Sequence, residues 1–273
     1  MSSEHAASPA AWSETESPFA FFRQMLAVAE ADTRKLIHDP VELFTRMIQP
    51  VLWLTVFGSV FSRTRGIPTG GLRYLDFMAP GILAQSVLFG AIFYGISLIW
   101  ERDLGILQKF MVSPAPRSAL VSGRALSSTV RGLFQTVLVY LIAFLLGVNL
   151  RYEWWAIAGV LFAVMLGSAI FSTFSLIAAC IVKSRERFMG IGQVLTMPLF
   201  FASNAIYPLS MMPAWLRTLS TINPLSYQVD LLRALMVRGG VSVFGLGADF
   251  GILFLILALL IAVATKIYPR ILL

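Results

Sequence analysis

ERDLGILQKFMVSPAPRSALVSG, residues Glu101–Gly123, separates two long apolar runs, Ala79–Trp100 and Ala125–Leu146. A helix needs roughly 20 mainly apolar residues to cross the hydrocarbon core of a bilayer, and both runs reach that length. The stretch is therefore predicted to be a polar loop between two membrane-spanning helices, and the organisation of the chain follows from it.

The first half of this loop is predicted to form a short amphipathic helix. Apolar residues recur three and four positions apart at Leu104, Leu107 and Met111, among charged neighbours. Pro114 ends the helix, because proline lacks the backbone donor and restricts the residue before it. Such a helix docks into a groove on a soluble partner or lies on the lipid surface; alternatively, it is an ordinary continuation of the preceding span.

The composition places the chain among integral membrane proteins. It has 273 residues, of which 58% are hydrophobic and 13% are charged, whereas soluble domains average about 25% charged residues. The net charge of +7 is typical of Lys and Arg gathered on the cytoplasmic flanks of spans, not of a nucleic-acid surface. The fold class is all-α, with six predicted spans: Leu43–Phe61, Ala79–Trp100, Ala125–Leu146, Trp155–Val182, Met189–Tyr207 and Phe250–Ile267.

Three regions are expected. Residues 1–18 are polar and are predicted to be a disordered cytoplasmic tail. Residues 19–42 are predicted to form an amphipathic helix at the membrane interface, or alternatively a cytoplasmic helix packed on a partner. Residues 43–273 form the six-helix transmembrane domain.

The distribution of charge predicts the orientation in the cell membrane. With both termini in the cytoplasm, Lys and Arg residues on the inner side outnumber those on the outer side by about two to one. The loop that contains Arg63, Arg65 and Arg73 carries its charges on the other side and weakens this bias. The prediction is a multi-pass protein of the plasma or inner membrane with both termini inside.

The last outer segment, Leu209–Gly247, is too long for a tight turn. Its apolar residues recur at helical spacing on both sides of Asn223-Pro224, which predicts two short helices with a break between them. This pair, which includes Trp215 and Tyr227, is predicted to be a re-entrant hairpin; the alternative is a surface loop lying on the bilayer.

The sequence contains no recognisable catalytic or nucleotide-binding motif. It has no phosphate-binding Gly-x4-Gly-Lys-Ser/Thr loop, and its two histidines and one cysteine give neither a metal cluster nor a catalytic pair. We therefore expect no catalytic residue, metal or cofactor in this chain, and an energy source on a partner. Aromatic and polar residues within the spans are candidates for a substrate path, although packing explains each of them as well: Phe57, Phe93, Phe200 and Asn204.

Two phrases of the sequence resemble a known family, the permease subunits of type-2 ABC exporters of the drug-resistance and nodulation-factor kind. The first is Glu101-Arg102-Asp103 with Gly105, Leu107, Ser113-Pro114 and the small and basic residues Arg117–Arg124. The second is MMPAWLRTLSTINPLSYQVDLLRALMV, residues Met211–Val237. Gln108 departs from the pattern, because many members carry an acid there.

The resemblance implies a mechanism. Two permease subunits, identical or different, would surround a central path, and a separate ATPase subunit that binds ATP and Mg would contact each of them. The residues implied to couple the permease to the ATPase are Glu101, Arg102, Leu104, Gly105, Leu107, Phe110, Met111 and Pro114, with a second cytoplasmic contact at Lys183, Arg185 and Arg187. The hairpin of Trp215, Asn223, Pro224 and Tyr227 would cap the outer side of the path.

Export of a hydrophobic or amphiphilic substrate, a drug or a lipid-like molecule, fits the apolar spans. Export of a polysaccharide or lipo-oligosaccharide on the same scaffold is the alternative within transport. A channel or structural membrane protein without an ATPase is the alternative from another class, and it would have no need of an amphipathic loop with a Ser-Pro break.

Overall fold

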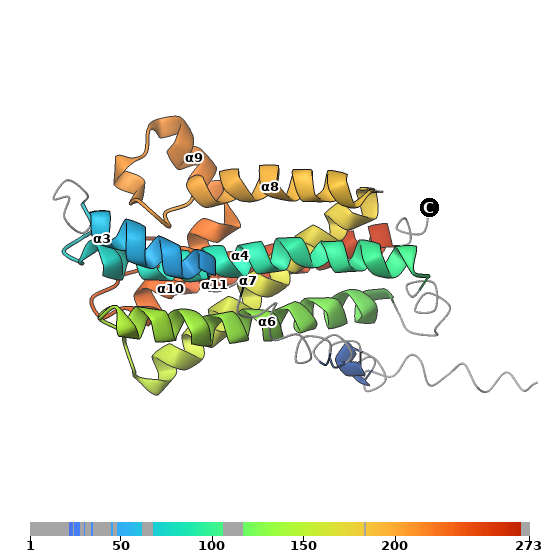
Figure 1. Cartoon of the computed structure of the whole chain (residues 1–273), viewed down its shortest axis with the longest axis horizontal. Helices are drawn as coiled ribbons and strands as arrows, with labels where there is room; N and C mark the ends of the chain where they lie inside the picture. Colours follow the sequence, from blue (N-terminus) through green and yellow to red (C-terminus); the bar gives the residue numbers. More distant parts are fainter. Residues whose placement is uncertain are drawn as a thin grey trace, which may run out of the picture.

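The structure is a computed structural model that describes residues 22–23, 25–27, 30, 34, 45, 48–61, 68–105, 117–182 and 184–268. Figure 1 shows a bundle of long helices that lie roughly side by side. The predicted tail of residues 1–18 lies outside the described residues, as does most of the predicted interfacial helix of residues 19–42.

The described part of the chain is helical, with one isolated antiparallel bridge between Leu150 and Val237. Its elements, in chain order, are the π-helix η2 (Trp53–Phe57), α3 (Gly58–Phe61), α4 (Tyr74–Asp103), α6 (Arg117–Leu145), α7 (Trp154–Ile181), α8 (Arg185–Phe201), the 3-10 helix η3 (Leu209–Met211), α9 (Ala214–Ile222), α10 (Pro224–Met236) and α11 (Leu246–Ile267).

Four described helices are long and apolar enough to cross a membrane: α4, α6 from Ser118, α7 and α11. They contain the second, third, fourth and sixth predicted spans almost completely. Only Leu146, the last residue of the third span, and Val182, the last residue of the fourth, lie beyond the helix ends. The helix α4 is longer than the apolar run Ala79–Trp100 at both ends. Its 30 residues extend about 45 Å at 1.5 Å per residue, more than a hydrocarbon core of about 30 Å, so its polar ends lie outside that core.

The first and fifth predicted spans correspond to shorter helices. Residues Ile48–Phe61 form a short apolar helix, and α8 has 17 residues, which extend about 26 Å. The helix α8 runs alongside α4 (Figure 1) and ends at Phe201, six residues before the predicted end of the fifth span. Six spans therefore stay a prediction, of which four have helices of sufficient length.

The helix α7 lies at the centre of the bundle. It packs against α4, α6, α10 and α11, and 72% of its most apolar window is buried, compared with 11% for α11. Small residues bring the helices close together: a Cβ atom at Gly167 of α7 would lie 2.1 Å from the side chain of Gln228 of α10. The core is therefore built around α7, and α11 presents an apolar outer face, as a lipid-exposed helix does.

The predicted break at Asn223-Pro224 is present. The helix α9 ends at Ile222, and Asn223 caps α10 by accepting a hydrogen bond from the backbone N–H of Leu225 at 2.9 Å. The amide of Asn223 also donates to the carbonyl of Leu199 at 2.6 Å. The helix α10 is buried against α4, α7 and α11, whereas α9 is largely exposed (Figure 1).

Candidate functional site

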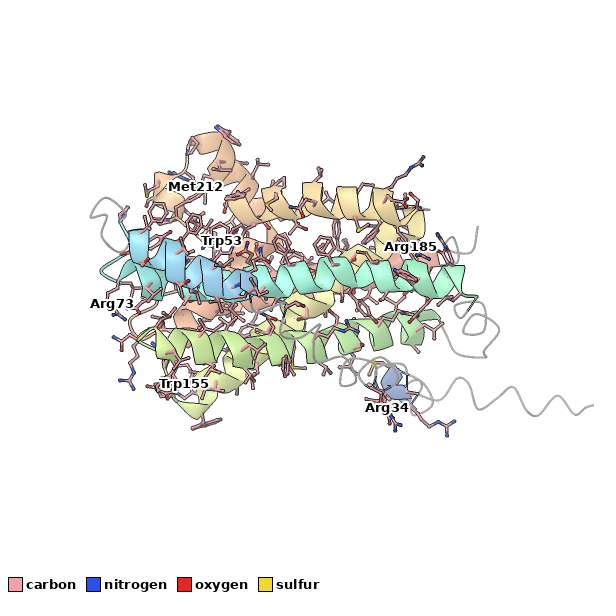
Figure 2. All side chains as sticks on the ribbon, in the orientation of Figure 1. Arg34, Trp53, Arg73, Trp155, Arg185 and Met212 are labelled. Carbon is pink, nitrogen blue, oxygen red and sulfur yellow. The ribbon has the colours of Figure 1, made fainter. Side chains whose placement is uncertain are left out.

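Five helix ends meet at one end of the bundle, which we call the Glu101 end. Here α4, α7 and α11 finish and α6 and α8 begin. The opposite end, which we call the Arg73 end, carries α9 and the start of α4. Figure 2 shows Arg185 at the first end and Arg73 with Trp155 at the second.

A buried ion pair joins α4 to α6 at the Glu101 end. Nη2 of Arg124 donates to Oε2 of Glu101 at 2.6 Å, and the two side chains are only 4% and 9% exposed. Removal of one member of a buried ion pair usually costs more than the pair itself contributes. The pair therefore links the last turn of α4 to the first turns of α6.

A second, more exposed set of charges joins α4 to α8. Asp103 accepts hydrogen bonds from Arg102 at 3.0 Å and from Arg185 at 2.8 Å. The guanidinium of Arg185 also lies 3.5 Å from the ring centroid of Trp100, which is a favourable cation–π distance. Arg185 thus holds the start of α8 against the end of α4.

An apolar cluster lies beneath these charges and includes Leu98, Cys180, Phe188 and Tyr268. Tyr268 directly follows α11 and is fully buried; burial raises the pKa of its phenol above the usual value. The cluster brings residues of α4, α6, α7, α8 and α11 together, so the Glu101 end packs as one unit.

The structure places only some of the predicted coupling residues. Glu101 points into the bundle, Arg102 lies at its edge, and Leu104 is exposed. Gly105 has a φ of 70°, a left-handed conformation that favours glycine. Leu107, Phe110, Met111, Pro114 and Lys183 lie outside the described residues.

The start of this stretch belongs to the preceding helix, since Glu101–Asp103 form the last turn of α4. The predicted amphipathic helix that includes Leu107 and Met111 falls mostly outside the described residues and stays a prediction. Of the second contact, Arg185 lies beside Asp103, whereas Arg187 is exposed. Sequence reasoning did not identify the partner of Glu101, although opposite charges at the facing ends of consecutive spans were a signal for it.

The candidate path residues do not form one site. Phe57 stacks on Trp53 with ring centroids 4.3 Å apart, and Trp53 contacts the fully buried Phe200 at 5.6 Å. Phe57 and Phe200 thus belong to one aromatic cluster between η2 and α8. Phe93 and Asn204 line two other cavities.

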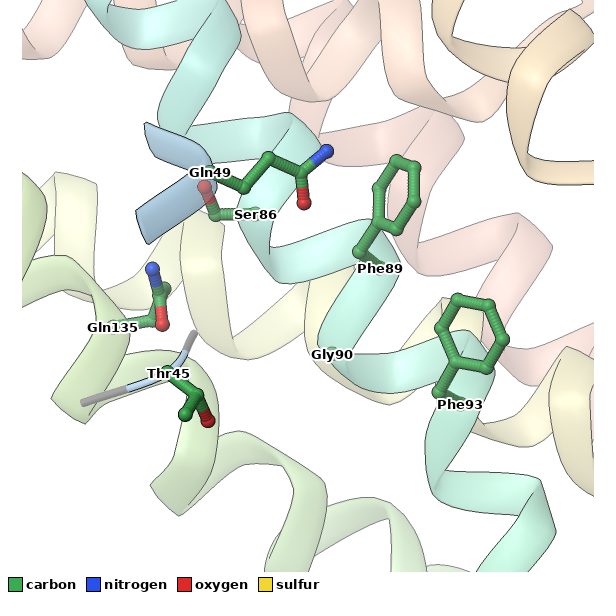
Figure 3. Close-up of a pocket in the computed structure, with 7 residues that line it drawn as sticks. All are labelled: Thr45, Gln49, Ser86, Phe89, Gly90, Phe93 and Gln135. Atoms are coloured by element: carbon green, nitrogen blue, oxygen red, sulfur yellow. The ribbon is translucent and has the colours of Figure 1, made fainter. Parts of the chain in front are cut away.

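Phe93 lines a cavity of about 320 Å³ between α4, α6 and the helix before η2. Figure 3 shows Phe89 and Phe93 on one side of it and the polar side chains of Gln49 and Gln135 on the other. The amide nitrogen of Gln135 is buried without a partner among the described residues. The remaining lining residues are Thr45, Ser86 and Gly90. Aromatic surface beside amide groups suits an amphiphilic ligand.

The hairpin residues lie at the Arg73 end. Trp215 is exposed on α9, whereas Asn223 and Tyr227 are buried, and the Tyr227 hydroxyl donates to the carbonyl of Thr221. Pro224 is the first residue of α10, a position where its missing N–H costs nothing.

Comparisons with known proteins agree with the membrane fold. The family described as ABC-2 type transporter matches residues 23–237. A protein of Cyanophora paradoxa described as a possible transport permease is 29% identical over 225 residues, which are 82% of this chain and 77% of that protein.

Two bacterial relatives carry more specific names. A daunorubicin resistance ABC transporter permease of Streptomyces coeruleorubidus is 25% identical over 73% of this chain and 70% of its own length. An inner membrane transport permease of Escherichia coli is 24% identical over 80% of this chain and 86% of its own length.

Proposed function

The chain belongs to the ABC-2 type transporter family, and from this membership we propose that it is the membrane-spanning subunit of an ATP-driven exporter. It is a multi-pass membrane protein of the permease type. In this proposal a separate ATPase subunit binds ATP and Mg, and this chain supplies the path and the contacts that respond to hydrolysis.

The linkage of helix ends at the Glu101 end carries the proposal. The segment of residues 106–116 follows the end of α4 in the chain, and in the last turn of α4 Glu101 and Asp103 bond to Arg124 of α6 and Arg185 of α8. A partner that moves this segment would therefore move the ends of three helices together. A channel with no motor has no use for such a linkage.

The proposal also assigns an orientation and an assembly. The Glu101 end and both termini are cytoplasmic, as the bias of positive charge favours. The helix of Ile48–Phe61 and α8 complete a set of six spans, and α9 with α10 forms the re-entrant hairpin on the outer side. Two permease subunits pair around the path.

The proposed substrate is a hydrophobic or amphiphilic molecule. The cavity of Phe89, Phe93 and Gln135 supports this class, because it combines aromatic and amide surface within the bundle. The relative from Streptomyces coeruleorubidus is named for resistance to daunorubicin, a drug, and drug export is the form of the proposal that this name favours.

The test uses Leu104, which is exposed at the Glu101 end, and Leu219, which is exposed on α9. Leu104→Asp is expected to reduce co-purification of the ATPase and ATP-dependent uptake of daunorubicin into inverted vesicles by about tenfold or more, since apolar anchors carry most of an interface. Leu219→Asp makes the same change away from the contact and is the control for ATPase binding. Full ATPase co-purification by a folded Leu104→Asp variant would refute this placement of the contact.

A further inference from the structure

A second cavity, of about 260 Å³, lies at the Arg73 end. It is bounded by the start of α4 and the residues before it, by the segment after α8, by the residues that follow α10, and by one charged side chain of α10. Its lining consists of Pro68, Thr69, Gly70, Leu72, Phe77, Asn204, Pro208, Leu209, Arg233, Gly239, Val241 and Val243. Most of this surface is apolar, and Arg233 is the charged residue among these side chains.

Arg233 is only 4% exposed, yet it lines the cavity. Its Nη2 donates to the carbonyl of Asn204 at 2.6 Å, and its guanidinium lies 3.8 Å from the ring centroid of Phe77. Its Nε makes a long contact of 3.4 Å to the carbonyl of Phe77. None of these contacts is with a carboxylate, and Nη1 is hydrogen-bonded to none of the described residues. A positive charge is therefore held at the cavity wall with donor capacity to spare.

Asp230, the acidic residue nearest to Arg233 along α10, forms its hydrogen bonds with other residues. Oδ2 of Asp230 accepts hydrogen bonds from the backbone N–H of Val243 at 2.6 Å and of Phe244 at 3.1 Å, and from the hydroxyl of Ser242 at 3.0 Å. Asp230 is fully buried and is not among the residues that line the cavity. The charges of Asp230 and Arg233 interact, but Asp230 accepts none of the hydrogen bonds that Arg233 donates among the described residues.

Asn204 lies in the same wall and connects Arg233 to Asp230. Its backbone carbonyl accepts from Arg233 at 2.6 Å, and its Nδ2 donates to Asp230 at 3.4 Å. Its Oδ1 is buried and has no partner among the described residues, and an acceptor of this kind does not bind an anion. The wall therefore offers guanidinium donors beside apolar surface.

We propose that this cavity binds the anionic group, a carboxylate or a phosphate, of an amphiphile whose apolar part lies against Leu72, Phe77 and Val241. A planar guanidinium matches the geometry of both groups, and bonds between ions are roughly twice as strong as neutral hydrogen bonds. The assignment of this amphiphile as cargo leaving the path rests on the proposed function; a membrane lipid headgroup has the same chemistry.

Hexyl phosphate is the probe, titrated by ligand-detected 31P NMR against the full-length permease in phosphatidylcholine nanodiscs. Arg233→Gln removes the charge, and Val241→Trp fills the cavity from a residue that is 73% exposed, so it leaves the buried contacts of α10 intact. Each variant is expected to weaken binding by about tenfold or more. Arg238→Gln removes an exposed charge that does not line the cavity and is expected to change the dissociation constant less than twofold.

Absence of saturable binding by the wild type would overturn the proposal. An unchanged dissociation constant in Val241→Trp would overturn it as well. The Val241→Trp result is decisive if Arg233→Gln does not fold. Nanodiscs that contain phosphatidylglycerol separate the two sources: competition there identifies lipid, and equal affinity in both discs identifies a ligand from solution. The assay contains no ATPase. A permease that binds the probe but does not export would therefore refute the proposed function alone.

Discussion

Replacement of Arg124 by Met tests the ion pair that joins α4 to α6. The change removes the Arg124 guanidinium from Glu101, whose side chain is only 9% exposed. Breaking a buried ion pair in this way costs about 3–5 kcal/mol. For a chain of this size, each kcal/mol lowers the melting temperature by roughly 2–4 °C, so we expect a loss of about 10 °C.

The double variant Glu101→Leu with Arg124→Met separates the pair from its surroundings. It removes both charges, and replacing a buried pair by apolar residues of similar volume is often neutral or stabilising. We therefore expect it to melt close to the wild type, although each single variant is unstable. The difference between the double variant and the sum of the singles measures the coupling.

The assay is thermal unfolding of the purified permease in detergent, followed by tryptophan fluorescence. Asp103→Asn is the matched control, because Asp103 and Arg185 are each about one third exposed and their pair is expected to contribute little and to weaken with salt. Single variants as stable as the wild type, or a double variant as unstable as the sum of the singles, would refute the reasoning.

Three further predictions concern orientation, capping and packing. In a cysteine-free background, Ser184→Cys is expected to react with an impermeant thiol reagent only from the cytoplasmic side and Thr218→Cys only from outside; labelling of position 184 in intact cells would reverse the topology. Asn223→Ala removes the cap of α10 and is expected to destabilise the fold by about 1–2 kcal/mol; an unchanged melting temperature would contradict this. Gly81→Ala places a Cβ 2.4 Å from a backbone oxygen and should cost about 1–3 kcal/mol, whereas Gly190→Ala meets nothing within 4 Å and should be neutral; equal effects would refute the packing argument.

Hydropathy predicted the positions of the four long helices. A membrane span must form its backbone hydrogen bonds within the helix, and its length must be covered with apolar residues. It did not predict where α4 begins and ends. The apolar run stops at Trp100, but the helix continues to Asp103, since Glu101 finds a cation on α6. Helix ends depend on such contacts, which a single segment does not contain.

The sequence pattern did not predict which residues far apart in the chain form pairs. Glu101 and Arg124 were each identified near the polar loop, yet spacing along the chain does not tell which of several arginines faces Glu101. In the same way, Asp230 and Arg233 belong to a segment interpreted as an outer hairpin, and charged residues there are expected to be exposed. Both are buried, because the backbone amides of residues 243 and 244 bond to Asp230 and the carbonyls of Phe77 and Asn204 accept from Arg233.

The central position of α7 has a consequence for biosynthesis. The helices α4 and α6 are made before α7, yet α7 covers much of their buried surface. At roughly 5–20 residues per second, the ribosome needs about 4–16 s to proceed from Asp103 to Ile181. During this interval the faces of α4 and α6 that will contact α7 are covered only by lipid or by the insertion machinery, so a chain truncated before Trp154 would lack the helix that packs against both.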